Sequence, residues 1–441
     1  MRIFYYTFGC KVNQYETESI KEKMEAQGKE TVTDHRQADV CIVNSCTVTS
    51  EADKKCRQLL HKIRKEAPGC VLVCAGCMTQ AHKDIASRLP ECDIIVGAHN
   101  KMTIPALITH YINTGERIVS ITDNDSEKFI EPMSNTSASS MTRSYIKIQD
   151  GCDMRCSYCI IPNARGHIRS KSIPDIISEA SALISAGHRE LILTGINLCC
   201  YGRENGGKTR LTDAVEAVCG LEGDFRVRLS SLEPELISDN DIKRLSRLGK
   251  LCPQFHLSLQ SGCDRILKAM NRHYTTAEYA ELCRRLRQAF PGCAITTDIM
   301  VGFPGETEQD HLESCEFVMS IGFAEAHIFP YSRRPDTPAD SLPCQLNGDI
   351  KAQRAAEMAE ICSRSQSEYL SENLGTVKKV LFERESSPEY HQGHTDNYIL
   401  VKVPRTNIPT LRGRMMPAKL CQLSDNCIIG ELCDDTLINK I

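Results

Sequence analysis

Short apolar runs alternate with longer amphipathic stretches in the N-terminal part of the chain. The runs are rich in β-branched and aromatic residues, as strands are. They occupy residues 2–8, 40–44, 71–75 and 93–96. In the amphipathic stretch at 51–67, apolar residues recur at helical spacing: Cys56, Leu59, Leu60 and Ile63. Strands that alternate with helices predict a parallel α/β sheet, and we assign residues 1–112 to this domain.

The alternation resumes after residues 121–143, which are rich in Ser, Asn, Asp and Thr, lack periodicity and predict a linker. Residues 144–367 contain six strand candidates separated by helical stretches. The candidates are residues 144–149, 190–195, 225–230, 254–260, 294–302 and 324–332. Six βα units predict a partial (β/α)6 barrel, an open relative of the eight-unit barrel, in which sites lie at the C-terminal ends of the strands.

The pattern changes again near residue 368. Short strand candidates at 376–383, 397–403 and 427–432 are divided by Gly, Pro and Asn, with no clear helix between them. This pattern predicts a small β-barrel over residues 368–438, so the expected fold class is α/β with an appended β-barrel. Barrels of this size commonly bind single-stranded or looped RNA, although a purely structural cap would have the same composition.

The composition indicates the compartment in which the chain works and the redox state of its cysteines. No run of about 18 apolar residues is present, and the N-terminus lacks the apolar core of a signal peptide. We therefore expect a cytoplasmic protein without membrane contact, whose 24 cysteines stay reduced. Most of them, such as Cys41 and Cys219, lie in apolar runs and are expected to be small core residues.

The net charge of −4 argues against a chain that is basic throughout, but three stretches contain Lys and Arg and no acid. They are residues 54–65, 154–174 and 397–424. Each alone is most simply a solvated face. Together they raise the prospect of a phosphate-binding surface.

Three closely spaced thiols, Cys152, Cys156 and Cys159, follow the first strand of the expected barrel, and the next cysteine is Cys199. A structural zinc site or a four-iron cluster normally takes four protein ligands. Three ligands on one loop therefore indicate either a catalytic zinc or a cluster with one uncommitted iron. Tyr158 places an aromatic residue directly before the last thiol.

This Cys-x3-Cys-x-aromatic-Cys loop resembles that of the radical S-adenosylmethionine (SAM) enzymes. The resemblance implies that the three thiolates hold a [4Fe–4S] cluster. SAM would chelate the open iron through its amino and carboxylate groups and be cleaved to a 5′-deoxyadenosyl radical. Cys152, Cys156 and Cys159 are then both metal ligands and catalytic residues.

A second set of cysteines follows three strands of the N-terminal sheet. Cys10, Cys46 and Cys77 are each one strand–helix repeat apart. Parallel strands end at the same edge of a sheet, where α/β proteins bind ligands, so these thiols are expected to converge. The alternative is three unrelated thiols near strand ends.

The surrounding sequences TFGCKVNQYETE, NSCTVTSEADKK and AGCMTQ are similar to the three cysteine motifs of the methylthiotransferase family. Members combine such an N-terminal domain with a radical SAM core and a C-terminal TRAM barrel, which matches essentially the whole chain. The resemblance implies that Cys10, Cys46 and Cys77 hold a second [4Fe–4S] cluster, whose open iron binds the sulfur to be transferred.

Other short motifs that resemble those of the family lie at strand ends, and the resemblance implies that they line the SAM pocket. Together with the aromatic residue of the thiol loop, they supply the candidate cofactor contacts: Tyr158, Gly195, Glu233, Gln260 and Arg272. Packing at the barrel mouth or a salt bridge is the alternative for each polar residue. Asp336 stands where the family usually has Gly, in the word YSRRPDT, and Asp tolerates a left-handed backbone better than most residues.

The family has branches that act on isopentenyladenosine in tRNA, on threonylcarbamoyladenosine in tRNA, and on an aspartate of a ribosomal protein. GCKVNQYETE resembles the threonylcarbamoyladenosine branch, whereas the isopentenyl branch tends to read GC-Q-M-N. The implied reaction adds a methylthio group at C2 of the adenine, with SAM as both methyl donor and radical source. The implied partners are the anticodon stem-loop of tRNA and a reduced electron donor such as flavodoxin or ferredoxin. An iron–sulfur sensor that binds RNA is the non-catalytic alternative.

Overall fold

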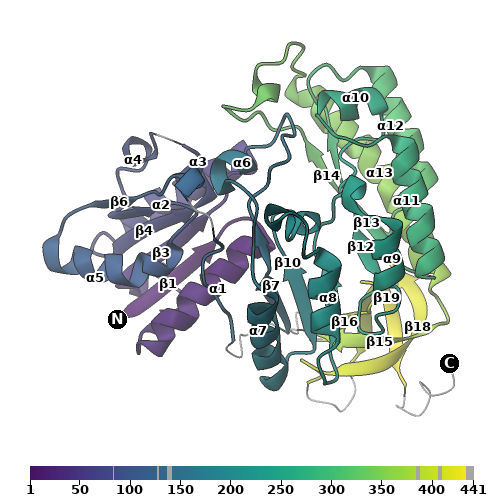
Figure 1. Cartoon of the computed structure of the whole chain (residues 1–441), viewed down its shortest axis with the longest axis horizontal. Coiled ribbons are helices and arrows are strands. Elements are labelled where there is room, and N and C mark those ends of the chain that lie inside the picture. Colours follow the sequence, from purple (N-terminus) through teal and green to yellow (C-terminus); the bar gives the residue numbers. More distant parts are fainter. Residues whose placement is uncertain (83, 127–128, 137–141, 384–387, 406–409, 434–441) are drawn as a thin grey trace.

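The N-terminal domain of the computed structural model is a six-stranded parallel sheet in the order β2-β1-β3-β4-β5-β6 (Figure 1). The structure describes the whole chain except residues 83, 127–128, 137–141, 384–387, 406–409 and 434–441. The strands are β1 Arg2–Thr7, β2 Glu30–Val32, β3 Val40–Ser45, β4 Val71–Gly76, β5 Ile94–Val96 and β6 Ile118–Ser120. The parallel sheet confirms the sequence prediction. The two short edge strands β2 and β6 were not predicted.

Helices cover both faces of this sheet. They are α1 Lys11–Ala26, α2 Ser50–Glu66, α3 Cys77–Ala81, α4 Ile85–Arg88 and α5 Ile104–Thr114. On one face, Cys56, Leu60 and Ile63 of α2 are buried against β3 and β4, as their helical spacing predicts. On the other face, α1 and α5 bury Ile20 and Ile108 against the sheet.

The six predicted strands of the central domain form two three-stranded parallel sheets, β11-β10-β7 and β12-β13-β14. Their bounds are β7 Arg143–Lys147, β10 Glu190–Thr194, β11 Arg226–Leu229, β12 Gln254–His256, β13 Ala294–Val301 and β14 Glu325–Pro330. Parallel bridges from Val227 to Leu251 and from Leu232 to Leu257 join the two sheets into one arc. This arc is the expected partial barrel.

Most helices of the central domain lie outside the arc (Figure 1). A short antiparallel hairpin flanks the loop of the three thiols. The helices are α6 Ile161–Arg165, α7 Ile173–Ser185, α8 Leu211–Cys219, α9 Asp239–Leu245, α10 Asp264–Ala269, α11 Thr276–Ala289, α12 Glu308–Ile321 and α13 Gly348–Glu372. The hairpin pairs β8 (Gln149–Asp150) with β9 (Arg169–Ser170). This pairing closes the base of the loop that contains Cys152, Cys156 and Cys159. Short 3-10 helices occupy His35–Gln37, Lys101–Thr103, Asn124–Ser126, Leu198–Cys200, Arg203–Asn205, Pro234–Leu236 and Pro338–Asp340.

The C-terminal domain is a closed barrel in the order β15-β16-β17-β19-β18, as the sequence predicts. The strands are β15 Val377–Phe382, β16 Tyr390–His394, β17 Leu400–Pro404, β18 Met415–Ser424 and β19 Cys427–Leu432. Two of them, β16 and β18, were not predicted, because neither shows a run of β-branched residues. Helix α13 continues past residue 367, where the sequence pattern placed the end of the central domain. Parts of the expected linker and of the expected C-terminal domain lie outside the described residues.

The C-terminal barrel packs against the lower ends of β7, β10 and β11 (Figure 1). The guanidinium of Arg226 donates to the carbonyl of His394 at 2.9 Å, and that of Arg228 donates to the carbonyl of Asp396 at 2.9 Å. Both arginines pair with the buried Glu190, which keeps them charged and oriented. Within the described residues, no helix is long and apolar enough to cross a membrane.

Candidate functional site

The cysteines of the N-terminal domain lie at the C-terminal ends of β1, β3 and β4, three strands adjacent in the sheet. Cys46 and Cys77 are buried and Cys10 is exposed. Gly9 directly precedes Cys10 and has a φ of +96°. A Cβ atom at Gly9 would lie 2.7 Å from Cβ and 2.8 Å from Sγ of Cys46, so only glycine allows these two strand ends to approach. The structure therefore brings the three thiols together.

Burial, and then the neighbouring Cys77, raises the pKa of Cys46 to about 12. Without a bound cation, this thiol would hold its proton at neutral pH. A metal ion or cluster supplies the positive charge that converts such thiols to thiolates. The residues present therefore fit an iron–sulfur cluster with three protein ligands.

Arg165 connects this triad to the central domain. It is the last residue of α6, which packs beside α3 (Figure 1), and its side chain is fully buried. Its Nε donates to Sγ of Cys77 at 3.2 Å, and its Nη2 donates to Oδ1 of Asn13 at 2.6 Å. The same guanidinium pairs with Glu16 on α1. An arginine that follows the loop of the central domain therefore contacts a thiol of the N-terminal domain.

Glu16 is the centre of this buried network. It accepts from Arg165, from Lys101 and, at 2.7 Å, from Lys147 on β7. Burial alone would raise the pKa of Glu16, but Arg165, Lys101 and Lys147 outweigh it and hold that pKa well below its usual value. Asp150 is the other acid, 2.6 Å from Lys147. Neither Glu16 nor Arg165 was predicted as a site residue; a Glu inside the apolar face of α1 was the available signal.

The second triad lies on the loop between β8 and α6, at the mouth of the barrel. Gly151 begins this loop with a φ of +72°, and a Cβ atom there would lie 1.8 Å from the carbonyl oxygen of His167. Cys156 is buried, and Cys152 and Cys159 are half-buried. Burial, and then the nearby Cys156, raises the pKa of Cys159 to about 12. A thiol with this pKa needs a nearby cation to ionise at neutral pH, which fits a metal cluster.

Three of the five predicted cofactor contacts, Arg272, Glu233 and Tyr158, lie beside this triad. Arg272 donates from Nη1 to Sγ of Cys156 at 3.4 Å and pairs with Glu233 through Nη2. Tyr158 directly precedes Cys159 in the loop and packs, partly buried, against Met270 and Tyr331. Arg272 also donates to the carbonyl of Ser258 at 3.1 Å, so its orientation is set by the barrel and by Glu233.

The other two contacts are further along the strand ends. Gly195 packs against Gln149, where a Cβ atom would lie 2.8 Å from Oε1. That oxygen accepts from the backbone of Asn197, whose side chain reaches Sγ of Cys152 at 4.0 Å. Gln260 has a φ of +66°, and its backbone is hydrogen-bonded to Asp298 and Met300 on β13. The structure thus groups Tyr158, Glu233 and Arg272 at the triad, with Gly195 nearby and Gln260 after β12, where it pairs with β13.

A cavity of about 650 Å³ runs inside the barrel between the N-terminal triad and the C-terminal barrel. Its lining includes Cys10 and Cys46, the strand-end residues Thr194, Gly195 and Ser230, and Tyr398 of the C-terminal barrel. Val48 and Phe329 also line it and expose 53% and 43% of their surface. A cavity of this size, with apolar side chains and a few polar groups, suits a ligand of nucleoside size.

A buried arginine from the loop after β14 adds a further contact between the central and N-terminal domains. Arg334 donates to Asp53 of α2 at 2.7 Å and to the hydroxyl of Thr47 at 2.6 Å. Asp336 lies two residues further on with a φ of +65°, the left-handed conformation expected where the family has Gly. The loop therefore accommodates Asp at this position.

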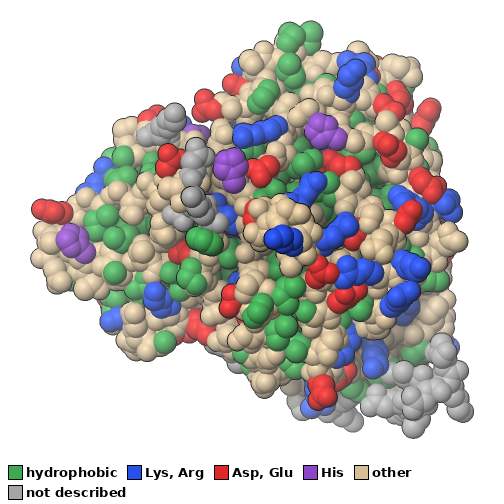
Figure 2. All heavy atoms as spheres, viewed as in Figure 1, with side chains coloured by type: hydrophobic (Ala, Val, Ile, Leu, Met, Phe, Trp, Pro, Cys, Tyr) green, Lys and Arg blue, Asp and Glu red, His purple; other side chains and the backbone are tan. Residues whose placement is uncertain are grey.

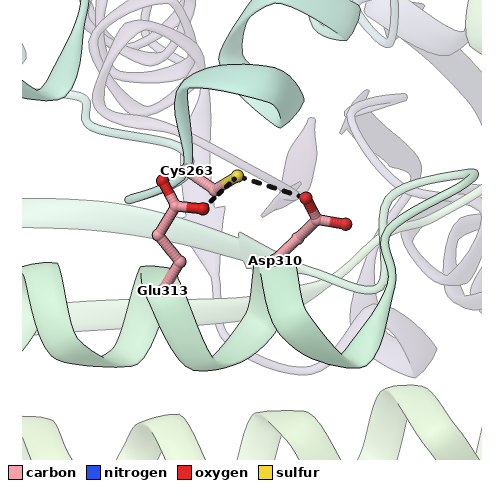
Figure 3. A group of neighbouring side chains, drawn as sticks. All are labelled: Cys263, Asp310 and Glu313. Atoms are coloured by element: carbon pink, nitrogen blue, oxygen red, sulfur yellow. Dashed lines mark hydrogen bonds between the residues drawn. The ribbon is translucent and has the colours of Figure 1, made fainter.

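A third group of ligand-type side chains lies on the outside of the barrel: Cys263, Asp310 and Glu313 (Figure 3). The thiol of Cys263 donates to both carboxylates at 3.3 Å. Asp310, however, already caps α12 through Thr307 and pairs with Arg265. The oxygens of Asp310 are committed, so this group serves as a helix cap and not as a third metal site.

The expected phosphate-binding surface is not continuous on the face in Figure 2. Lys and Arg side chains lie among Asp and Glu over α8, α9 and α11 on that face. The basic run at 54–65 lies on α2, where Lys54, Lys55 and Arg57 are exposed. Its solvated face is open to a polyanion. In the basic run at 154–174, by contrast, three of the cations are buried in ion pairs: Arg165 with Glu16, Arg169 with Asp150 and Lys171 with Glu179.

Replacing Gly9 with alanine should remove iron from the N-terminal triad, because the new Cβ atom displaces Cys46. Iron analysis and absorbance of the purified protein should show the loss of the iron and the absorbance that belong to one of the two clusters. Gly28→Ala is the matched control: its φ is +74°, yet nothing lies within 4 Å of the added atom. Equal iron in both variants would show that the approach of Gly9 to Cys46 does not matter.

Comparisons with known proteins agree with this geometry. The profile of the radical SAM superfamily matches residues 146–318, and that of the uncharacterized protein family UPF0004 matches residues 2–97. A solved structure of the radical SAM methyltransferase TsrM from Kitasatospora setae aligns with a TM-score of 0.55 at 14% identity, over 77% of each chain. OxsB, a cobalamin-dependent radical SAM enzyme, aligns with a TM-score of 0.51 at 11% identity, over 82% of this chain and 56% of that one. The fold and the thiol loop thus define a radical SAM enzyme.

Relatives that align over nearly the whole chain identify the family within this superfamily. Threonylcarbamoyladenosine tRNA methylthiotransferase MtaB of Bacillus subtilis is 34% identical, over 90% of this chain and 89% of its own. Its namesake in Thermotoga maritima is 36% identical, over 89% of each. The tRNA-2-methylthio-N(6)-dimethylallyladenosine synthase of Finegoldia magna is 32% identical, over 97% and 94%. The chain belongs to the radical SAM methylthiotransferase family.

Proposed function

We propose that this enzyme methylthiolates C2 of N6-threonylcarbamoyladenosine beside the anticodon of tRNA. The observation that carries the proposal is the cavity inside the barrel beside the N-terminal triad. It is lined by Cys10 and Cys46 and, at the strand ends, by Gly195, which packs on Gln149. Gln149 in turn holds Asn197 beside Cys152 of the second triad. The reaction needs a sulfur donor and a radical source close to one substrate, and a nucleoside in this cavity would lie against the first triad, inside the barrel that carries the second.

When bound, the clusters and SAM supply the radical, the methyl group and the site for sulfur. Cys152, Cys156 and Cys159 would hold one [4Fe–4S] cluster, and Cys10, Cys46 and Cys77 would hold the other. Arg272 donates a hydrogen bond to Cys156, and its ion pair with Glu233 holds it in this position. Its guanidinium group therefore places a positive charge beside the thiolates. Tyr158, Gly195 and Gln260 are the remaining candidate contacts to SAM.

The chain's own residues position the substrate and exclude water. Val48 and Phe329 present apolar surface inside the cavity, where a planar base can be buried. Tyr398 closes the lower end, packed between the guanidinium groups of Arg143 and Arg228 at 5.4 and 4.8 Å from its ring. The C-terminal barrel thus contributes a wall of the cavity as well as its expected contact with the anticodon stem-loop.

The proposed setting is the reducing cytoplasm, with a flavodoxin- or ferredoxin-type electron donor. A reducing compartment would keep the thiols of the cysteine-rich chain available as cluster ligands. The domain limits 1–112, 144–367 and 368–438 likewise remain a proposal. Helix α13 lies across the last of these limits.

The second candidate substrate is N6-isopentenyladenosine. Relatives named for the dimethylallyl substrate match this chain at 32–33% identity, close to the values for the threonylcarbamoyl relatives. Overall similarity therefore does not separate the two branches. The motif GCKVNQYETE favours the threonylcarbamoyl substrate.

Mass spectrometry of tRNA nucleosides tests the proposal. The gene is expressed in a host that lacks its own methylthiotransferases, and the host without the gene is the control. We expect methylthio-threonylcarbamoyladenosine to appear. Methylthio-isopentenyladenosine alone would move the substrate to the second candidate. Neither product, from protein with both clusters intact, would point to a ribosomal-protein aspartate or to a sensor that binds RNA.

A further inference from the structure

Lys11 is a cation that lines the cavity beside the N-terminal triad. It is the first residue of α1 and directly follows Cys10. Its side chain is exposed to the cavity. In the described part of the chain, no hydrogen bond or ion pair is made by its ammonium group. The cavity therefore presents one amine that is free to meet a ligand.

The other cations of the cavity are already committed. Arg228 donates to Glu190 and to the carbonyls of Thr395 and Asp396. Arg143 pairs with Glu383 at 2.9 Å. Both also pack over the ring of Tyr398. These two guanidinium groups hold the C-terminal barrel in place and leave Lys11 as the available positive charge.

Some of the acidic side chains in and around the cavity also have ionic partners. Asp298 lies 3.2 Å from Nε2 of His256, and Glu190 is buried behind Arg226 and Arg228. Glu325 and His327 complete the titratable lining on β14. Lys11 thus faces a cavity that holds two arginines and few free carboxylates, a setting that favours an anionic ligand group.

We propose that Lys11 binds the carboxylate of an amino-acid substituent on N6 of the substrate adenosine and so selects that substrate over one with an apolar substituent. The inference rests on the proposed function, and it adds the residue that recognises the substituent on N6. A threonylcarbamoyl group carries a carboxylate, whereas an isopentenyl group has no polar atom. A charge-assisted hydrogen bond discriminates strongly, because an apolar substituent would leave the ammonium desolvated and unpaired.

Two other anions could meet Lys11: a backbone phosphate of the RNA and the carboxylate of SAM. The experiment separates them by changing only the substituent. Anticodon stem-loop RNAs carry either N6-threonylcarbamoyladenosine or its methyl ester, which keeps the shape and loses the charge. Both RNAs are assayed with cluster-loaded wild type, Lys11→Gln, Lys11→Arg and the control Lys29→Gln, which lies outside the cavity lining.

With the carboxylate RNA, Lys11→Gln should lose about 10- to 100-fold in kcat/KM, chiefly through KM, the size typical of a hydrogen bond to a charged group. With the methyl ester, the same variant should differ from wild type by less than about twofold. Lys11→Arg should keep most of the preference for the carboxylate. Equilibrium binding of both RNAs, measured without SAM, should show the same pattern in Kd, and iron content should be unchanged.

Equal losses on both RNAs would overturn the proposal and assign Lys11 to a phosphate, to SAM or to the fold. No loss on either RNA would also overturn it. A different result would reject the proposed function itself: wild type that methylthiolates an isopentenyladenosine stem-loop but not the threonylcarbamoyl one. The two failures are therefore distinguishable.

Discussion

Cys159→Ala should leave no detectable methylthiolated nucleoside. The variant has two thiols on the loop between β8 and α6, and two are too few to hold the cluster that cleaves SAM. Enzymes accelerate their reactions by about a million-fold or more, and without the radical no alternative route to the C2–H bond remains. Nucleoside mass spectrometry measures the product, and release of 5′-deoxyadenosine measures the cleavage of SAM. Binding of tRNA should be largely kept, because Cys159 lies outside the cavity lining.

Cys219→Ala is the matched control for this variant. Cys219 is a half-buried thiol at the end of α8, packed against the core and remote from both triads. Its loss should reduce stability slightly and leave product formation intact. Methylthiolated product from Cys159→Ala at the level of the control would show that the loop does not hold the radical-generating cluster.

Glu16→Gln should cause the largest loss of stability among substitutions outside the two triads. The change leaves Lys101, Lys147 and Arg165 buried with Asp150 as their remaining acid. Removing one partner from a buried ion-pair network costs about 3–5 kcal/mol, since the charges left behind stay desolvated. Urea unfolding should show this loss in the transition that separates the N-terminal and central domains.

The effect should depend on pH with a definite sign. The pKa of Glu16 is held well below its usual value, so its contribution is complete above the unfolded-state pKa of about 4.3. That contribution is lost as the pH falls through the depressed folded-state pKa. The difference between wild type and Glu16→Gln should therefore be constant near neutral pH and shrink only in acid. A difference that grows toward alkaline pH would contradict this account.

Glu18→Gln, on the same helix, is the control. Glu18 is accessible to solvent and lies 3.7 Å from Lys21. Such a surface pair contributes little, and the free energy of unfolding should change by less than about 0.5 kcal/mol. A double variant, Glu16→Gln with Arg165→Met, should recover part of the loss, because it removes one of the uncompensated cations.

The sequence by itself determined the three-part architecture. Alternating apolar and amphipathic runs predicted the parallel N-terminal sheet and the six barrel strands, because side-chain periodicity follows directly from the geometry of strands and helices. It missed the edge strands β2 and β6, which have three residues each, and the barrel strands β16 and β18. These strands are held by their neighbours in the sheet, and their own residues show no strong preference.

The spacing of the cysteines along the chain also predicted that each triad converges. Cys152, Cys156 and Cys159 share one loop, and Cys10, Cys46 and Cys77 follow strands that end at one sheet edge. Local sequence and the rule for parallel strands were sufficient for these predictions. The ligand roles of the six thiols and the contacts of SAM remain proposals.

Only the tertiary structure decided what surrounds the triads. Arg165 and Cys77 are far apart in sequence, as are Glu16 and Lys147, and no periodicity links them. Their contacts depend on how the N-terminal domain packs on the barrel, which is set by the total fit of buried surfaces and charges. The same packing places Lys11 and Tyr398 in one cavity. A single sequence specifies elements through local periodicity, whereas pairing between domains is a long-range property that appears only in the folded chain.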